Sequence, residues 1–274
     1  VARVSDLADT HRYSPPPFKA LDKPKNGIQL HVEPFDVPPN FEREFFMYKN
    51  LNNRSPIYVN RVQIEMRPGS HHFIGYLLDS SRPLFSLAKR LFVPNRIRDL
   101  HLPNGDDDPL VLASMNYHNF FAGTQTPRFD YEFPKGVALR LPANTGLDLN
   151  THYVNRGEEA FEGEVYMNLH TIEKADVEHE AKIINFNNTD IELPPNKITT
   201  LTRDFRATEK MNIFQLFSHS HEKTVEFRVE IAGGNRDGEL LYISYDWEHP
   251  PVMKFDPPLI VKRGETIRLK VKYD

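Results

Sequence analysis

The sequence predicts an all-β protein built from two antiparallel, jelly-roll-like β-sandwich domains. Three observations lead to this prediction. The length of 274 residues is enough for two hydrophobic cores, short segments of alternating or β-branched character recur between turn signals, and 22 prolines are spread through the connections. Hydrophobic residues make up 39% of the chain and charged residues 26%, which is typical of a packed globular protein.

The predicted strands form two groups, separated by the polar run EKADVEHE at 173–180, where we place the domain boundary. The first group comprises residues 28–32, 43–48, 58–66, 73–78, 137–141 and 164–171, and the second comprises residues 198–205, 224–231, 240–245 and 266–271. We therefore expect a proline-rich arm or linker at 1–26, an N-terminal β domain at 27–176 and a C-terminal β domain at 177–274.

Two segments between the strands need separate interpretations. Residues 84–91 predict a short helix in a loop, because Pro94 follows closely. The acidic run at 106–108 lacks the alternating ligands and the terminal Glu of a calcium loop, so we expect a solvated turn there.

Composition excludes several classes of function. The chain has no cysteine, so it has no disulfides and no thiolate ligands, and any metal must be held by His, carboxylate or Met. The net charge of -4 comes without a large basic block, so we expect no binding to nucleic acid or to an anionic membrane surface. No apolar run approaches the roughly 18 residues of a membrane span.

Five of the 12 histidines fall into three compact patterns: His71-His72, His152 within NTHY, and His219-Ser220-His221. Residues i and i+2 of a strand point to the same face, so His219 and His221 can present two imidazoles to one metal ion. We expect isolated histidines such as His31, His101, His118 and His179 to be surface or hydrogen-bonded residues.

The adjacent pair needs a special arrangement, because His71 and His72 would point to opposite faces of a regular strand. Joint ligation requires a local twist or bulge, or binding through different ring nitrogens. His152 would then supply a third imidazole. A nitrogen-rich site without sulfur suits copper or zinc, and copper binds more tightly to a given set of ligands.

With these residues in place, the chain resembles the copper type II, ascorbate-dependent monooxygenase family, which includes peptidylglycine α-hydroxylating monooxygenase and dopamine β-monooxygenase. The likeness runs from about Gly27 to Asp274 and depends on the order and spacing of several motifs. These are SHHFIGY at 70–76, FPKGV at 133–137, NTHY at 150–153, NLHT at 168–171 and FQLFSHSH at 214–221.

The resemblance implies one copper on each of the two domains. His71, His72 and His152 match the ligands of the copper that stores and passes electrons. His219 and His221 match two catalytic ligands of the copper that binds O2 and abstracts hydrogen from a substrate C–H bond.

The resemblance also implies partners and a compartment. O2 and ascorbate or another one-electron donor would be co-substrates, a small molecule or a chain end would be hydroxylated, and the protein would be secreted or periplasmic. His170 lies in a family-like strand, and we expect it to be structural.

Two departures from the family pattern affect the second copper site. In the family, the O2-binding copper has a third ligand, the thioether of a Met near the end of the second domain. This chain reaches Asp274 before that segment would arrive. Met253 falls too early in the sequence to be the counterpart of that Met. We therefore expect the second site to be incomplete within these residues. The amidating member has an Arg just ahead of its His-x-His, where this chain has Phe217 and Ser218, so peptide amidation is not expected.

Two alternatives remain open. One is a non-catalytic copper-binding or copper-delivery module that uses His71, His72 and His152. The other is a cupin-like oxygenase with a single metal, because His219-x-His221 and Glu226 reproduce the first cupin spacing.

Overall fold

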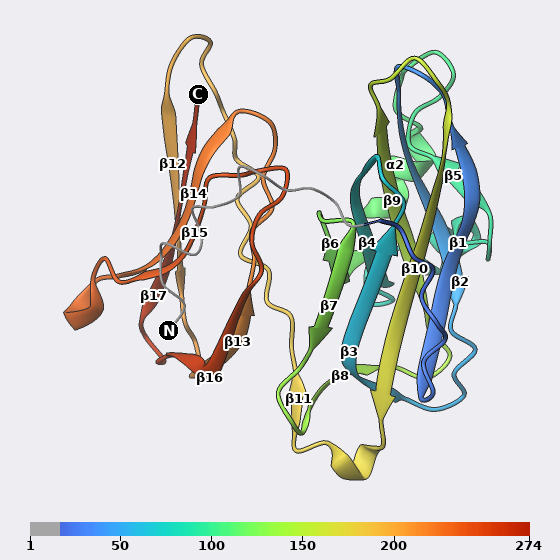
Figure 1. Cartoon of the computed structure of the whole chain (residues 1–274). Coiled ribbons are helices and arrows are strands. Elements are labelled where there is room, and N and C mark those ends of the chain that lie inside the picture. The colour runs from blue at the N-terminus through green and yellow to red at the C-terminus, as the bar shows by residue number, and fades with distance from the viewer. Residues whose placement is uncertain (1–16) are drawn as a thin grey trace. The chain divides into compact units, whose positions relative to one another are not determined.

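The computed structural model describes residues 17–274, and the first 16 residues of the predicted proline-rich arm lie outside the described part of the chain. The described chain is mostly β and divides into two compact units, 17–183 and 184–274, each with its own hydrophobic core (Figure 1). The prediction of an all-β sandwich fold is confirmed.

The first unit consists of two sheets that enclose one core. Its six-stranded sheet has the order β1-β10-β3-β8-β11, with β7 also paired to β3, and its five-stranded sheet has the order β5-β2-β9-β4-β6. The strands of the first sheet are β1 (Gly27–Val37), β3 (Ile57–Met66), β7 (Arg128–Glu132), β8 (Val137–Leu141), β10 (Phe161–Ile172) and β11 (His179–Ala181). Those of the second are β2 (Phe41–Asn50), β4 (Ser70–Leu78), β5 (Ile97–Asp99), β6 (His118–Thr124) and β9 (Gly146–Asn155).

Strand β9 determines where polar residues can lie in this unit. Its odd-numbered residues, such as Leu147 and Leu149, are fully buried in the core between the sheets. Because side chains alternate along a strand, Asp148, Asn150 and His152 point to the opposite face of the sheet. That face is buried too, since these three residues are at most 8% exposed.

Residues between β4 and β6 cover the outer face of β9. Arg98 on β5 donates from Nη2 to both carboxylate oxygens of Asp148, at 2.5 and 2.6 Å, and His118 Nε2 lies 2.8 Å from Asp148 Oδ2. Arg98 Nη1 also donates to Ser114 Oγ at 3.0 Å. The fully buried Asp148 thus holds this connection onto the sheet.

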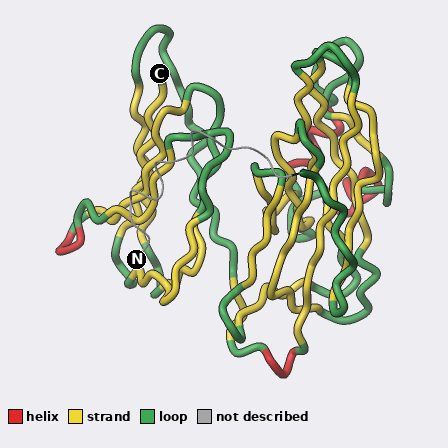
Figure 2. Tube along the Cα trace, in the orientation of Figure 1, coloured by secondary structure: helices red, strands yellow, loops and turns green. Residues whose placement is uncertain are grey.

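The helices are short and occur in connections (Figure 2). The predicted helix at 84–91 is confirmed as α1 (Phe85–Ala88) followed by the 3-10 turn η2 (Lys89–Leu91). Helix α2 (Pro109–Met115) was not predicted. The expectation of a solvated turn at 106–108 was therefore incomplete, because Asp108 caps α2 by accepting from Leu110 N at 2.8 Å. The Asp-Pro pair was the signal for this helix start.

Strand β11 explains why the first unit extends beyond the predicted boundary at 176. It pairs in parallel with β8, with His179 opposite Val137. The connection between β10 and β11, which contains η3 (Lys174–Asp176), therefore stays with the first unit, and the division between the units falls after Ile183.

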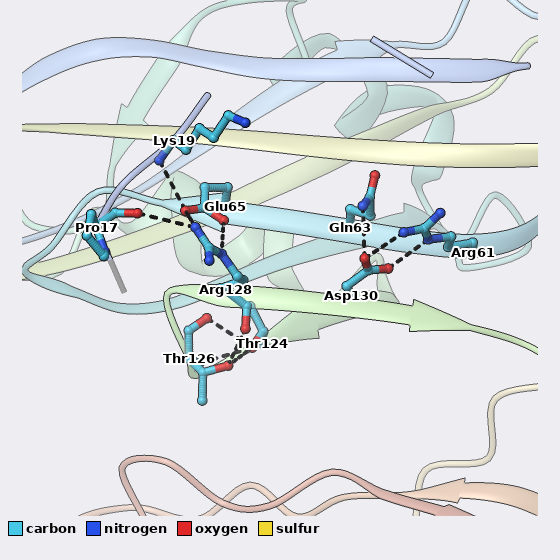
Figure 3. Close-up of polar contacts among 9 residues, drawn as sticks. All are labelled: Pro17, Lys19, Arg61, Gln63, Glu65, Thr124, Thr126, Arg128 and Asp130. Atoms are coloured by element: carbon cyan, nitrogen blue, oxygen red, sulfur yellow. Dashed lines mark hydrogen bonds and ion pairs between the residues drawn. The ribbon is translucent and has the colours of Figure 1, made fainter. Parts of the chain in front are cut away.

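The described part of the N-terminal arm is tied to the outer face of the six-stranded sheet (Figure 3). Glu65 on β3 is only 2% exposed and accepts hydrogen bonds from Lys19 N at 3.2 Å and from Arg128 Nε at 2.7 Å. Arg128 also donates to Pro17 O at 3.2 Å. The buried carboxylate thus joins the arm to two strands.

The second unit pairs a four-stranded sheet with a two-stranded one. The larger sheet has the order β12-β17-β14-β15, and β13 pairs with β16. The strands are β12 (Thr199–Arg206), β13 (Met211–Leu216), β14 (Thr224–Ala232), β15 (Leu240–Ser244), β16 (Met253–Val261) and β17 (Thr266–Tyr273), with the 3-10 turn η4 (Gly234–Arg236) between β14 and β15. Strands β13 and β16 were not predicted; Pro257 and Pro258 conceal the pattern of β16.

Across residues 17–274, we find no helix with the length and apolar character required to cross a membrane.

Replacing Glu65 with Ala should release the arm. The variant should lose about 1–3 kcal/mol of unfolding free energy in urea, a modest figure because Arg128 can regain water when its partner is removed. Trypsin should also cleave faster after Lys19 and Lys25, whereas the bond after Lys23 resists trypsin because Pro24 follows it. Glu162→Ala, at an exposed position of β10, is the matched control, and equal cleavage rates in the two variants would show that Glu65 does not hold the arm.

Candidate metal centre

The first histidine cluster is formed where β4 pairs with β9. In this antiparallel pairing Ser70 lies opposite Tyr153 and His72 lies opposite His152, so His71 is an extra residue on β4. A β-bulge of this kind re-aims a side chain by breaking the alternation of faces. A bulge, which is one of the arrangements predicted for joint ligation by His71 and His72, is therefore present.

The three imidazoles form a compact group. One potential ligand atom from each of His71, His72 and His152 lies within 4.8 Å of the others. Their ring centroids are separated by 5.3 Å for His71 and His72, 4.9 Å for His71 and His152, and 4.8 Å for His72 and His152. His72 and His152 are each 8% exposed, whereas His71 is half-buried. The group therefore has one side nearer to solvent.

The hydrogen bonds around His72 determine which ring nitrogen carries its proton. Asn150 Nδ2 donates to the carboxylate of Glu44 at 2.9 Å, so the amide oxygen of Asn150 faces His72. His72 Nε2 lies 2.5 Å from that oxygen and must be the donor, because a carbonyl oxygen only accepts. The lone pair of the neutral ring is therefore on Nδ1.

His152 has the same tautomer for a similar reason. Its Nε2 lies 2.6 Å from Glu42 Oε1, a carboxylate oxygen, and therefore donates. Its buried Nδ1 forms no hydrogen bond with any residue in the described range, and Glu44 Oε2 lies 3.9 Å from it. A buried lone pair without a donor is unfavourable unless a cation or water meets it.

These features fit a bound metal ion. Metal-ligating histidines usually donate their other ring nitrogen to a carboxylate or an amide oxygen, as His152 does to Glu42 and His72 does to Asn150. Glu42 and Glu44 also supply two carboxylates near the cluster, which would offset the charge of a divalent cation.

The second histidine pair lies in a loop. His219 and His221 fall in the connection at 217–223 between β13 and β14, not within a strand as the alternation argument assumed. The two residues are nevertheless close, with ring centroids 5.0 Å apart and ring planes at 76°. The loop backbone, rather than strand alternation, brings them together.

Tyr242 anchors this loop to the second unit. Its hydroxyl lies 3.0 Å from Ser218 Oγ, next to His219 in the chain, and donates to Pro251 O at 2.9 Å. Tyr242 is 1% exposed, and desolvation by burial is the main cause that raises the pKa of its phenol to about 12. The hydroxyl therefore stays protonated at neutral pH and remains a donor.

The pKa of His219 is lowered to about 4, first by desolvation and second by the nearby His221. His219 nevertheless keeps exposed surface, so its desolvation is partial. The ring is therefore neutral at pH 7 and can offer a lone pair to a metal.

Two other residues considered from the sequence do not join His219 and His221. Met253, on β16, is 8% exposed and packs in the core of the second unit. Glu226 forms an ion pair with Arg228 at 3.0 Å, and within the described chain it is not part of a three-ligand group with the two histidines.

Most of the remaining histidines have polar partners. His170 Nε2 lies 2.7 Å from Gln63 Oε1, and desolvation by burial is the main cause that lowers its pKa. His31 pairs with Glu164 at 2.9 Å, and His101 pairs with Asp107 at 2.9 Å. The sequence did not identify Glu42, Glu44 and Asn150 as parts of the site. The available signal was the spacing of Glu42 and Glu44 at the start of the strand predicted at 43–48, although Glu42 fell just outside that range, and the register of pairing could not be read from it.

No family model matches the chain, and no curated protein sequence matches it. Among solved structures, the chain is similar to the crystal structure of the PBSX exported protein XepA, with 8% sequence identity and a TM-score of 0.25, over 96% of this chain and 99% of that chain. A likeness at this level carries no argument about family or function.

Replacing Asn150 with Ala should weaken metal binding by the first cluster, because His72 would lose the acceptor that orients its ring. We expect a loss of roughly 10–100-fold in Cu(II) affinity, measured by competition with a chelator. Asn119→Ala, at an exposed position of β6 in the same sheet, is the control. Unchanged affinity in the Asn150 variant would contradict an orienting role.

Proposed function

We propose that this protein is a copper-dependent monooxygenase that hydroxylates a C–H bond of a small molecule or chain end, using O2 and an ascorbate-like reductant. The single observation that supports this proposal best is the bulged histidine cluster. Two of its three imidazoles have their Nε2 atoms bound to protein acceptors, which leaves Nδ1 as the lone-pair atom of each ring. The order of the sequence motifs, which resembles the copper type II monooxygenases, supports the catalytic assignment.

The chemistry of the donors favours copper. The cluster is built from three imidazoles without sulfur, and copper binds such a set more tightly than zinc does. Copper would supply one-electron redox chemistry, which the insertion of one oxygen atom from O2 into a C–H bond requires.

In the first unit, His71, His72 and His152 would hold one copper ion. Glu42 and Asn150 would keep the rings of His152 and His72 oriented through their Nε2 hydrogen bonds. Because two of these ligands are 8% exposed, the surrounding sheet limits the access of water and of competing ligands.

In the second unit, His219 and His221 would be ligands of a second copper ion and would lie next to the reacting substrate. Their exposure is consistent with a site that a substrate must reach, and the neutral state of His219 at pH 7 suits ligation. Tyr242 would act as a positioning residue by holding Ser218 beside them.

Phe217 indicates which class of substrate the loop can recognise. It precedes the histidine pair and is 42% exposed. The loop therefore presents an aromatic ring at the position where the amidating member of the family has an Arg, whose guanidinium can bind a carboxylate through two hydrogen bonds. We therefore expect a substrate whose reacting end carries no free carboxylate. We also expect the protein to work outside the cytoplasm, as the resemblance implies.

The two alternative functions differ in whether they need His219 and His221. A copper-delivery module needs only the first cluster, so His219 and His221 would be dispensable. A cupin-like oxygenase needs Glu226 as a ligand, and the pairing of Glu226 with Arg228 is an observation against that reading.

Copper content distinguishes these functions. After reconstitution and removal of loosely bound metal, the parent protein should hold two copper ions per chain, and His72→Ala and His219→Ala should each hold one. The His72 variant should keep the second unit folded, because each unit has its own core. A parent with a single copper ion that is lost with His72 but kept with His219→Ala would favour the copper-delivery module.

Product analysis tests the catalytic part. With 18O2, ascorbate and a panel of aliphatic and benzylic substrates, the parent should form a hydroxylated product that carries one labelled oxygen. His219→Ala should reduce this product at least 100-fold while retaining the copper of the first cluster, because it removes a ligand beside the reacting substrate. His179→Ala, an exposed histidine on β11, is the control. Oxygen uptake with ascorbate alone is not a test, since loosely bound copper oxidises ascorbate.

A further inference from the structure

A basic and apolar segment covers part of the five-stranded sheet. We define it as residues 82–98, which include α1, η2 and the start of β5. The segment contains five Arg or Lys residues and no Asp or Glu, although the whole chain has a net charge of -4. Positive charge is therefore concentrated in one short connection. The expectation that the chain binds no anionic membrane surface rested on the net charge and did not take this segment into account.

One side of this segment is anchored to the protein. Phe92 is 5% exposed, and its ring centroid lies 6.2 Å from that of His118. The Phe85 ring lies 5.7 Å from the Tyr117 ring, and Arg98 is held by Asp148. The segment is therefore a packed part of the first unit.

The other side presents leucines to solvent. Leu84 is 69% exposed and Leu87 is 53% exposed. Arg90 follows in the same segment, and its Nε donates to Leu87 O at 3.0 Å. Val93 at 43% and Ile97 at 37% are further exposed apolar residues of the segment.

Leu84 also has an unfavourable backbone conformation. Its φ of 62° lies in the left-handed region, which costs a non-glycine residue roughly 1–2 kcal/mol. Since its side chain is mostly exposed, burial of that side chain within this protein does not offset the cost. The conformation instead holds a large aliphatic side chain out in solvent.

The exposed cations of the segment lack acidic partners. Lys89, Arg90 and Arg96 are exposed and form no ion pair with a carboxylate of residues 17–274. The carboxylates that flank the segment are already engaged, since Asp79 pairs with Arg82 at 3.3 Å and Asp99 pairs with Arg43 at 3.0 Å.

We propose that residues 82–98 form a peripheral docking surface for an anionic lipid bilayer, with Leu84 and Leu87 entering the headgroup region and Lys89, Arg90 and Arg96 meeting lipid phosphates or carboxylates. Exposed aliphatic side chains beside uncompensated Lys and Arg residues are the combination that binds such surfaces. This surface is independent of the proposed copper chemistry.

The size of the apolar surface favours lipid over a second copy of the chain. Four partly exposed aliphatic side chains present on the order of 400 Å², about half of the ~800 Å² that each partner buries in a stable protein interface. A bilayer requires no such matched area, because it adapts to protruding side chains.

Vesicle co-sedimentation tests the proposal with the full chain. The protein should sediment with phosphatidylcholine vesicles that contain about one-third phosphatidylserine, and not with pure phosphatidylcholine. Raising the salt concentration from about 0.1 M to about 1 M should weaken binding, because the Debye length falls from about 10 Å to about 3 Å.

Two double variants separate the apolar and electrostatic parts. Leu84→Ser with Leu87→Ser should weaken vesicle binding at least tenfold, and Lys89→Gln with Arg90→Gln should weaken it by roughly 30-fold. Lys262→Gln with Arg263→Gln, an exposed basic pair in the second unit, should bind as the parent does. Circular dichroism confirms that each variant is folded.

Three results would overturn the proposal: no binding of the parent to phosphatidylserine vesicles, an equal loss in the Lys262 and Arg263 control, or unchanged binding in both variants of the segment. A parent dimer in light scattering that Leu84→Ser with Leu87→Ser converts to a monomer would assign the surface to contacts between copies instead.

Discussion

The β-bulge at His71 is the constraint on which the first histidine cluster depends. In an unbroken strand, one of the two adjacent histidines would point into the core between the sheets, where an imidazole has no polar partner. The extra residue on β4 shifts the pairing so that His72 lies opposite His152 and His71 joins them. The neighbouring core residues keep their places, because Phe73 on β4 and Tyr153 on β9 remain buried between the sheets.

One face of strand β9 carries three polar residues that have different roles. His152 belongs to the cluster, Asn150 orients His72 and is held by Glu44, and Asp148 binds Arg98 and His118. The residue that anchors the covering connection is thus four positions from the candidate ligand. The basic and apolar segment proposed to meet lipid is attached to the same strand through Arg98.

The two histidine groups differ in how they are positioned. The first is on paired strands and is largely buried, and hydrogen bonds orient the rings of His72 and His152, so this group is held rigidly. The second is exposed on a loop, and the contact of Tyr242 with Ser218 anchors the chain beside it. A rigid, buried group suits reversible redox chemistry, and an exposed one suits the approach of a substrate.

The amino-acid sequence by itself determined the all-β class, the short helix at 84–91 and the histidines worth examining, because strand alternation, proline placement and residue chemistry are local properties. It did not reveal α2, whose signal is a single Asp-Pro cap, and it did not reveal the strands β5, β6, β7, β9, β11, β13 and β16. It also did not reveal that β11 attaches to the first unit. Only the tertiary structure decided the register that places Glu42, Glu44 and Asn150 around the imidazoles, and the loop that brings His219 to His221. The physical reason is that pairing register and loop path depend on contacts between residues far apart in the chain, whereas the pattern of a single strand fits several registers equally well.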